Sequence, residues 1–361
     1  MADDQEFRDE IGEVEDPLLH RPLSELGMVL IAERRRVGSD RLTISVPVPN
    51  YPGLSVLEAR LQAALESSGS DAEITIEVMD DAGRAALMNA LRKDAPPGIG
   101  ETGSRTRVIA VSSGKGGVGK SSVTTNLAVA LSRKGHSVGV IDGDIWGFSI
   151  PRMLGIGQPP VVIDESIIPP EAHGVKAMSM DYFVPDDKAV IWRGPMLHKA
   201  IEQFLKDVWW GDPEFLIVDM PPGTGDIAIS MAQFLPRAQV LLVTTPQPTA
   251  QRVAKRAALM AAQVNQEVMG VVENMSWFTG DDGKKYEIFG SGGGQALADD
   301  LDVPLMARVP LLPSMREGAD HGAPVTTVAP DSEAAAAFDR LADAVIAKKP
   351  RVRTHPELVI R

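Results

Sequence analysis

The stretch that decides the fold is residues 114–121, which read GKGGVGKS. It follows an apolar run at residues 107–113, RVIAVSS, and leads into KSSVTTNLAVALSRKG, whose apolar residues have helical spacing. A strand, a Gly-rich loop and a helix in this order predict a phosphate-binding loop. The glycines let backbone N–H groups converge on phosphate oxygens, and the helix N-terminus adds further donors and a favourable dipole.

Two side chains of this loop carry specific roles. Lys120 is expected to meet the β- and γ-phosphates, and the Ser121 hydroxyl to bind Mg²⁺. The remaining residues expected to bind the nucleotide through the loop are Gly114, Lys115, Gly116, Gly117, Val118, Gly119 and Ser122.

Three aspartates are candidates for the chemistry around the phosphates. Asp219 ends the buried run FLIV at residues 215–218, where a Walker B acid helps to hold Mg²⁺. Asp142 and Asp144, in IDGDIWG, face one way along an extended backbone. We expect Asp142 to contribute to the metal site and Asp144 to position the attacking water, the alternative being a solvated pair.

The glycines and threonine of residues 221–226, PPGTGD, suit a loop that responds to the γ-phosphate. This loop directly follows Asp219.

The pattern of apolar segments predicts two domains. After residue 106, runs such as SVGVIDGD, EFLIVDM, QVLLVTTP and EVMGVVENM are apolar on both faces and mostly separated by helical segments. Such strands indicate an α/β fold with a mostly parallel sheet covered by helices on both faces. Binding loops then gather at the carboxyl edge of the sheet.

The first 93 residues alternate between helical and strand patterns and predict a small α+β domain. DPLLHRPLSEL, LSVLEARLQAALES and AGRAALMNALRK are expected to be helical, and MVLIAERRR, RLTISVPVP and EITIEVMD to be strands. Residues 94–106 are rich in Pro and Gly and predict a linker. The ATPase domain is expected over 107–347 and a solvated basic tail over 348–361.

Composition excludes several classes of function. The formal charge of −13 disfavours nucleic acid as a partner, and no apolar run is long enough for a membrane span. The chain has no cysteine, which excludes disulfides and thiolate ligands of its own, and its six histidines are too dispersed for a zinc signature. The acidic start of the chain does not read as a signal peptide, so a cytoplasmic location is the expectation.

GKGGVGKS, with Lys115 directly after the first glycine, resembles the deviant Walker A motif of the Min-type and Par-type ATPases and the nitrogenase iron protein. The resemblance implies a nucleotide-sandwich homodimer in which Lys115 reaches the partner's phosphates. A cation placed on developing phosphoryl charge can accelerate transfer strongly.

Within that family the chain resembles the Mrp, or ApbC, branch of iron–sulfur cluster carriers. The motifs that carry the resemblance are IDGDIWGFSIPRMLG, WRGPM, DMPPGTGD, VTTPQ, VVENMSWF and FGSGGG, spread over residues 141–294. The resemblance implies that Asn274, at a strand end, contacts adenine, which makes ATP with Mg²⁺ the expected ligand. The N-terminal domain resembles the small domain of iron–sulfur assembly systems.

Two departures from that branch bear on its cargo. The usual CxxC pair falls on Gly280 and Gly283, and the cysteine of the small domain falls on Tyr51. Clusters ordinarily require thiolates or, less often, histidines. Asp281 and Asp282 in the same loop are read as a turn rather than as a cation site.

Two functions remain open from the sequence. The first is an Mrp-type ATPase that assembles iron–sulfur clusters or transfers them to apoproteins, with iron–sulfur apoproteins or assembly proteins as partners. The alternative is a dimeric adaptor ATPase, switched by nucleotide, that recruits a protein partner without a metal. DNA segregation and membrane positioning are disfavoured by the net charge and by the prolines of the tail.

Overall fold

The computed structural model describes residues 2–35, 37–93, 97–101, 103–144, 147, 149–183, 194–223, 229, 232–235 and 237–350. The chain forms two compact units. The first comprises Met1–Pro97, Gln158–Pro170 and Asp207–Asp212, and the second Gly98–Gly157, Glu171–Lys206 and Pro213–Arg361. Each unit has its own apolar core.

The second unit is built on an eight-stranded sheet of order β15-β12-β11-β4-β10-β5-β9-β8. All neighbours are parallel except the edge pair of β8 and β9. Its strands are β4 (Arg107–Ser113), β5 (Val138–Asp142), β8 (Glu171–Ala172), β9 (Val175–Ser179), β10 (Phe215–Asp219), β11 (Gln239–Thr244), β12 (Glu267–Glu273) and β15 (Leu305–Arg308).

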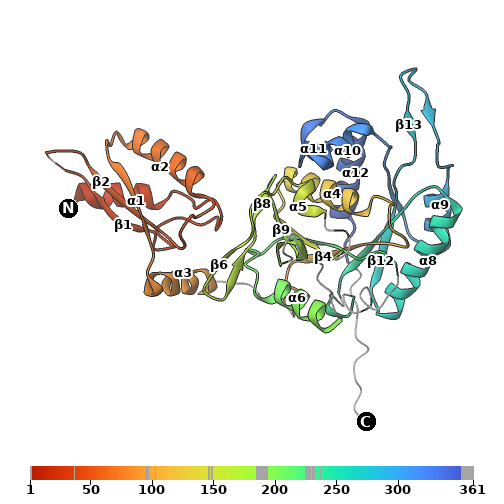
Figure 1. Ribbon diagram of the computed structural model, residues 1–361, viewed down its shortest axis with the longest axis horizontal. Helices are drawn as coiled ribbons and strands as arrows, with labels where there is room; N and C mark the ends of the chain where they lie inside the picture. Colours follow the sequence, from red (N-terminus) through yellow and green to blue (C-terminus); the bar gives the residue numbers. More distant parts are fainter. Residues whose placement is uncertain are drawn as a thin grey trace, which may run out of the picture. The chain divides into compact units, whose positions relative to one another are not determined.

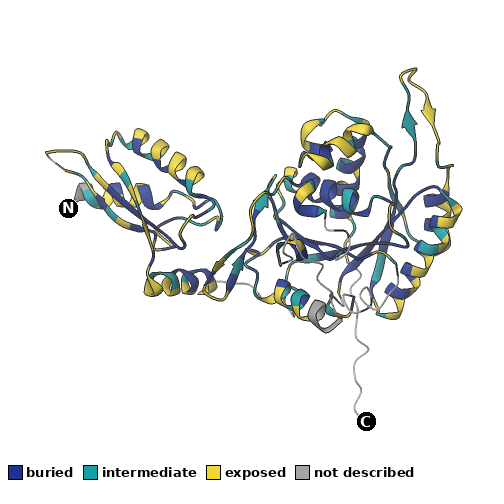
Figure 2. Cartoon of the chain, viewed as in Figure 1, coloured by how far each residue is buried: buried dark blue, intermediate teal, exposed yellow. Residues whose placement is uncertain are grey.

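Helices cover both faces of this sheet, as Figure 1 shows, with α4 and α12 on one face and α6 and α8 on the other. The helices are α4 (Lys120–Arg133), α5 (Ile150–Met153), α6 (Gly194–Lys206), α8 (Pro248–Gln263), α9 (Gly293–Leu301), α10 (Pro313–Asp320), α11 (Val325–Val328) and α12 (Glu333–Ala347), with a 3-10 turn η1 (Met180–Phe183). The strands β5, β10 and β11 are buried at every position, as Figure 2 shows for the sheet, which is why they read as continuous apolar runs. The α/β fold with a mostly parallel sheet is confirmed.

Strand register brings the phosphate loop and two aspartates to one edge. In the middle of the sheet, β10 lies between β4 and β5, and Asp219 pairs with Val111 on one side and with Asp142 on the other. The carboxyl ends of parallel strands meet at the same edge. Asp219 and Asp142 therefore lie next to each other where β4 enters the phosphate loop.

The first unit contains a three-stranded sheet of order β1-β2-β3, with β1 (Val29–Glu33) antiparallel to β2 (Arg41–Val46) and β2 parallel to β3 (Glu73–Val78). It also holds α1 (Ala2–Gly12), α2 (Leu54–Ser68), α3 (Asp81–Lys93) and the antiparallel pair of β6 (Val161–Ile163) with β7 (Ser166–Ile168). The β6–β7 pair contributes Ile163 and Ile168 to the core of this unit. The first domain was predicted to end at residue 93, so the prediction did not assign Gln158–Pro170 or Asp207–Asp212 to it.

One predicted helix of the first unit is wrong. DPLLHRPLSEL forms turns instead of a helix, and α1 lies upstream of it. The Asp16 carboxylate accepts the backbone N–H groups of Leu18 and Leu19, which favours a turn over a helix, and His20 has a left-handed φ of 52°. The other two helices and the three strands predicted for this region are present.

In the part of the chain that the structure describes, no helix combines the length and the apolar character needed to cross a membrane.

Candidate functional site: a phosphate loop at the sheet edge

Two glycines of the loop between β4 and α4, Gly114 and Gly119, lie where a side chain would have no room. A Cβ at Gly114 would lie 2.2 Å from the backbone carbon of Val253 in α8. Gly119 precedes α4 with a left-handed φ of 80°, and a Cβ there would lie 2.2 Å from Nδ2 of Asn274. Only glycine allows this approach of backbone to backbone and side chain.

Asp219 is the centre of the polar contacts at this edge. It is fully buried, and its Oδ2 accepts the Ser121 hydroxyl at 2.7 Å and lies 2.6 Å from Nζ of Lys120. Its Oδ1 accepts the Thr124 hydroxyl at 2.8 Å. Lys120, Ser121 and Asp219 thus come together as the sequence predicted.

Thr124 was not among the predicted site residues. The signal for it was available, because Thr124 lies one helical turn after Ser121 and so occupies the same face of α4. Its hydroxyl also contacts the carbonyl oxygen of Lys120 at 3.1 Å.

Asp142 is buried and supports the neighbouring loop. Its Oδ1 accepts the backbone N–H of Asp144 at 3.3 Å, and its Oδ2 accepts the N–H groups of Ser149 and Ile150 and the Ser179 hydroxyl at 3.0–3.3 Å. Burial is the main cause that raises the pKa of Asp142 to about 7, and the negative charge of the nearby Asp219 carboxylate is the second. Both oxygens that were expected to face a metal ion are engaged in holding the loop.

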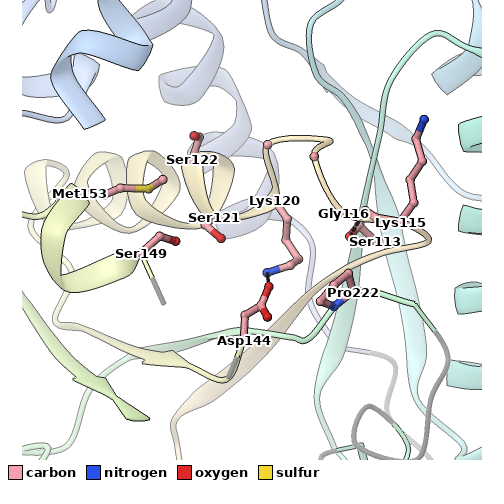
Figure 3. A pocket seen from close by; sticks show the side chains of 12 residues that line it. Ser113, Lys115, Gly116, Lys120, Ser121, Ser122, Asp144, Ser149, Met153 and Pro222 are labelled. Atoms are coloured by element: carbon pink, nitrogen blue, oxygen red, sulfur yellow. Dashed lines mark hydrogen bonds and ion pairs between the residues drawn. The ribbon is translucent and has the colours of Figure 1, made fainter. Parts of the chain in front are cut away.

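Asp144 differs from Asp142 because its side chain reaches the phosphate pocket. Its Oδ2 lies 3.8 Å from Nζ of Lys120, and the two side chains point toward one another in Figure 3. Together with the phosphate loop it lines a pocket of about 190 Å³. The lining residues are Ser113, Lys115, Gly116, Gly117, Gly119, Lys120, Ser121, Ser122, Asp144, Ser149, Met153 and Pro222.

Lys115 takes a different direction from Lys120. In Figure 3 its side chain extends away from Lys120 and Asp144. Its Nζ donates a hydrogen bond to Oε1 of Gln247 at 3.2 Å. The two lysines of the loop therefore do not converge within this chain.

Asn274 contacts the phosphate loop itself. The side chain is buried and its Nδ2 donates to the carbonyl oxygen of Val118 at 2.8 Å. The structure thus gives Asn274 a role in fixing the loop, whereas the adenine contact expected of it stays a prediction.

Some predicted features lie outside the described residues. They are Ile145, Trp146 and Phe148 of IDGDIWGFSIPRMLG, Thr224 to Asp226 of PPGTGD, Trp192 and Arg193 of WRGPM, and most of the basic tail.

The two positions at which carriers of the Mrp branch place cysteines lie around the turn of a short hairpin, β13 (Phe278–Thr279) with β14 (Lys285–Tyr286). A Cβ at Gly280 would lie 2.8 Å from the Tyr286 ring, and Gly283 has a left-handed φ of 74°. Among the described residues no group of three or more His, Cys, Asp or Glu side chains is placed to hold a metal ion. In a chain without cysteine, the described residues therefore offer no ligand set for a directly bound cluster.

A parallel sheet with a Gly-rich loop, a lysine, a serine and a buried aspartate at its carboxyl edge defines a P-loop nucleotide-binding protein. A family model described as the NUBPL iron-transfer P-loop NTPase, of the ParA group, matches residues 104–346, and the chain belongs to this family.

The chain is similar over most of its length to curated proteins. It is 44% identical to the iron-sulfur cluster carrier protein of Mycobacterium leprae, covering 95% of this chain and 92% of the relative. It is 39% identical to the protein of the same name from Bacillus subtilis, covering 86% and 89%.

Solved structures agree with the fold of the second unit. A nucleotide-binding protein from Archaeoglobus fulgidus in complex with ADP matches with a TM-score of 0.54 and 34% identity, over 60% of this chain and 86% of that one. The septum site-determining protein MinD from Pyrococcus horikoshii, complexed with Mg-ADP, matches with a TM-score of 0.52 and 25% identity, over 66% and 96%.

Proposed function

We propose that this protein is an ATPase that carries iron–sulfur clusters to apoproteins, working as a cytoplasmic homodimer. The observation that carries the ATPase part is the contact of Lys120, Ser121 and Thr124 with the buried Asp219 at the loop–helix junction. The names of the relatives support cluster transfer and do not favour the adaptor alternative.

The donor set fits Mg²⁺ with ATP. Ser121 and Asp219 present hydroxyl and carboxylate oxygens, the ligands that Mg²⁺ prefers, and we assign the metal to them. Mg²⁺ neutralises phosphate charge when bound. Asp142, which the sequence also placed in the metal site, is instead assigned to holding the loop of Asp144 and the start of α5, because its oxygens already accept donors there.

The remaining roles follow from the directions of the side chains. We assign Lys120 to the β- and γ-phosphates of the nucleotide in its own chain, and the backbone N–H groups of the loop to cradling them, because these residues line one pocket. Asp144 reaches the same pocket and is assigned to orient the attacking water. The Lys115 side chain extends away from Lys120 and Asp144, which supports a role on the partner's phosphates in a dimer.

The test of the ATPase mechanism is a Lys115→Ala variant. We expect turnover to fall by about a hundredfold or more, because the variant lacks a cation that stabilises the phosphoryl group during transfer. The affinity for ADP should stay within about threefold of that of the unchanged protein. Arg316→Gln, on the exposed part of α10, is the matched control for loss of one cation. Unchanged turnover in Lys115→Ala, or a monomer by light scattering under every nucleotide condition, would contradict the trans role.

The test of the carrier function is the loading of an apo-ferredoxin from a cluster donor under anaerobic conditions. We expect this protein with Mg-ATP to accelerate the loading, and an equal rate in its absence would refute the proposal.

A further inference from the structure

Glu273, the last residue of β12, carries a fully buried carboxylate that has no role in the mechanism proposed above. Three donors surround it. Its Oε2 accepts the backbone N–H of Gly294 at 2.6 Å, and its Oε1 accepts Nε–H of Arg308 at 2.9 Å and lies 2.9 Å from the Ser276 hydroxyl. A buried charge is stable only where it is paired and hydrogen-bonded, so these donors fix the position of the carboxylate.

Glycines at the start of α9 make one of these contacts possible. A Cβ at Gly294 would lie 2.5 Å from Cβ of Glu273, and a Cβ at Gly293 would lie 2.3 Å from the carbonyl oxygen of Pro246. Backbone N–H groups in the first turn of a helix have no acceptor within the helix, so the N–H of Gly294 can donate to the carboxylate. The last two glycines of FGSGGG therefore let α9 approach Glu273.

Glu273 in turn holds the strained turn that carries Asn274. The Ser276 hydroxyl lies 2.9 Å from both the carbonyl oxygen and Oε1 of Glu273. Between them, Met275 has a left-handed φ of 57°. A residue with a side chain keeps such a conformation where the surrounding contacts over-determine it. The backbone N–H groups of Asn274 and Ser276 also donate, to carbonyl oxygens at the end of β11 and just beyond β15.

The turn brings two side chains against the phosphate loop. Nδ2 of Asn274 donates to the carbonyl oxygen of Val118 at 2.8 Å. The terminal carbon of Met275 would lie 3.6 Å from a Cβ at Gly119, so this side chain also lies beside the loop. Both contacts fall directly before α4, where Lys120 begins the helix. The end of the loop is thus held by the turn, and the turn by Glu273.

We propose that Glu273 is a positioning residue for nucleotide binding. Its carboxylate holds the turn, and Asn274 then fixes the phosphate loop in the shape that receives the phosphates. Donors that are already in place need no ordering when the nucleotide binds, which strengthens binding. The inference rests on the proposed ATPase function and adds to it a residue that does not line the phosphate pocket.

The experiment is calorimetric titration of ADP into the full-length protein carrying Glu273→Gln. Glutamine keeps the size of the side chain but replaces one acceptor oxygen by an N–H group, so either Gly294 or Arg308 loses its acceptor. Glu287→Gln is the matched control, because it removes an exposed carboxylate 3.9 Å from the same Arg308. We expect Glu273→Gln to weaken ADP binding about tenfold, the order of one hydrogen bond lost from the loop, and the control to stay within about twofold.

An Asn274→Ala background shows whether Glu273 acts through Asn274. In that background Glu273→Gln should change the affinity for ADP by no more than about twofold, because the contact it supports is already gone. A tenfold loss that persists there overturns the proposal. Equal affinities of Glu273→Gln and Glu287→Gln also overturn it, even if the urea midpoint is lower, because a carboxylate that only stabilises the fold gives that result.

Steady-state ATP turnover gives an independent readout. The loop contacts the phosphates before and during transfer, so Glu273→Gln should raise KM for ATP and leave kcat within about threefold. A fall in kcat at unchanged KM would contradict a role in nucleotide binding.

Gly294→Ala is the second variant, and it decides the question if Glu273→Gln does not fold. It keeps the carboxylate but pushes against Cβ of Glu273, at a helical position where alanine is intrinsically favoured over glycine. We expect ADP to bind about threefold more weakly or worse, and unchanged affinity would overturn the proposal.

The proposed function is judged separately, on the unchanged protein. Absence of both ADP binding and ATP turnover there would remove the ATPase itself. Binding and turnover that are normal in the unchanged protein and equally normal in Glu273→Gln would remove only the role of Glu273.

Discussion

Replacing Gly119 by alanine isolates the contact between the phosphate loop and Asn274. The new Cβ would lie 2.2 Å from Nδ2 of Asn274, so the amide must move and give up its hydrogen bond to the Val118 carbonyl. Leaving that buried carbonyl unpaired costs about 1–3 kcal/mol. The left-handed φ of 80° adds about 1–2 kcal/mol for any residue with a Cβ. We expect the free energy of unfolding to fall by about 2–5 kcal/mol, reduced by about 0.4–1 kcal/mol because alanine restricts the unfolded chain.

Gly117→Ala is the matched control for this substitution. Gly117 has nearly the same φ, 77°, but a Cβ there meets no atom within 4 Å. We expect its free energy of unfolding to fall only by the conformational cost of about 1–2 kcal/mol. This fall is reduced by about 0.4–1 kcal/mol because alanine restricts the unfolded chain. The difference between the two variants therefore reports the Asn274 contact.

The assay is urea unfolding, followed at the transition that added ADP shifts, together with calorimetric titration of ADP. The midpoint of that transition should be lower in Gly119→Ala than in Gly117→Ala, and ADP should bind about tenfold more weakly, since 1.4 kcal/mol corresponds to a factor of ten. In an Asn274→Ala background the two glycine variants should become equal. Equal losses in the unchanged background would refute the reasoning.

Three further substitutions test other parts of the structure. Lys120→Ala leaves the buried Asp219 without its cation, and we expect a loss of about 3–5 kcal/mol in the same urea transition together with loss of ADP binding by calorimetry. Between about pH 4 and about pH 7 the folded protein keeps a proton on Asp142 that the unfolded chain has lost, because the pKa of Asp142 is raised in the folded state. The free energy of unfolding should therefore fall as pH rises through that window. Asp142→Asn should remove this slope in urea midpoints measured across the window, and an unchanged slope would contradict the assignment. Tyr51→Phe removes the hydroxyl that donates to the buried Asp16 at 2.7 Å, and the transition of the first unit, which ADP does not shift, should lose about 1–3 kcal/mol.

The sequence predicted the parts of the fold that are encoded locally. The strand before the loop, the loop and the helix after it agree with β4 and α4, because apolar periodicity and the glycine spacing act over a few residues. The contact of Lys120 and Ser121 with Asp219 also followed, since the carboxyl ends of parallel strands share one edge.

The features that the sequence did not reveal depend on long-range packing. The roles of Asp142 and Asn274 depend on their hydrogen-bond partners, which are distant in sequence. The Ser179 hydroxyl donates to Asp142, and the Val118 carbonyl accepts from Asn274. The predicted helix over DPLLHRPLSEL failed because Asp16 engages backbone donors in a turn, an outcome that apolar spacing does not reveal.

The composition of the first unit has a consequence for synthesis on the ribosome. Its core includes Ile163 and Ile168, with Trp209 packed against it, and these residues come well after the sheet and helices of residues 1–93. A nascent chain that ends at residue 93 lacks part of this apolar core, although N-terminal segments generally fold first during translation. The N-terminal unit can therefore complete its core only after the phosphate loop and β5 have been synthesised. Fragments cut at residue 93 should expose apolar surface that the intact chain covers.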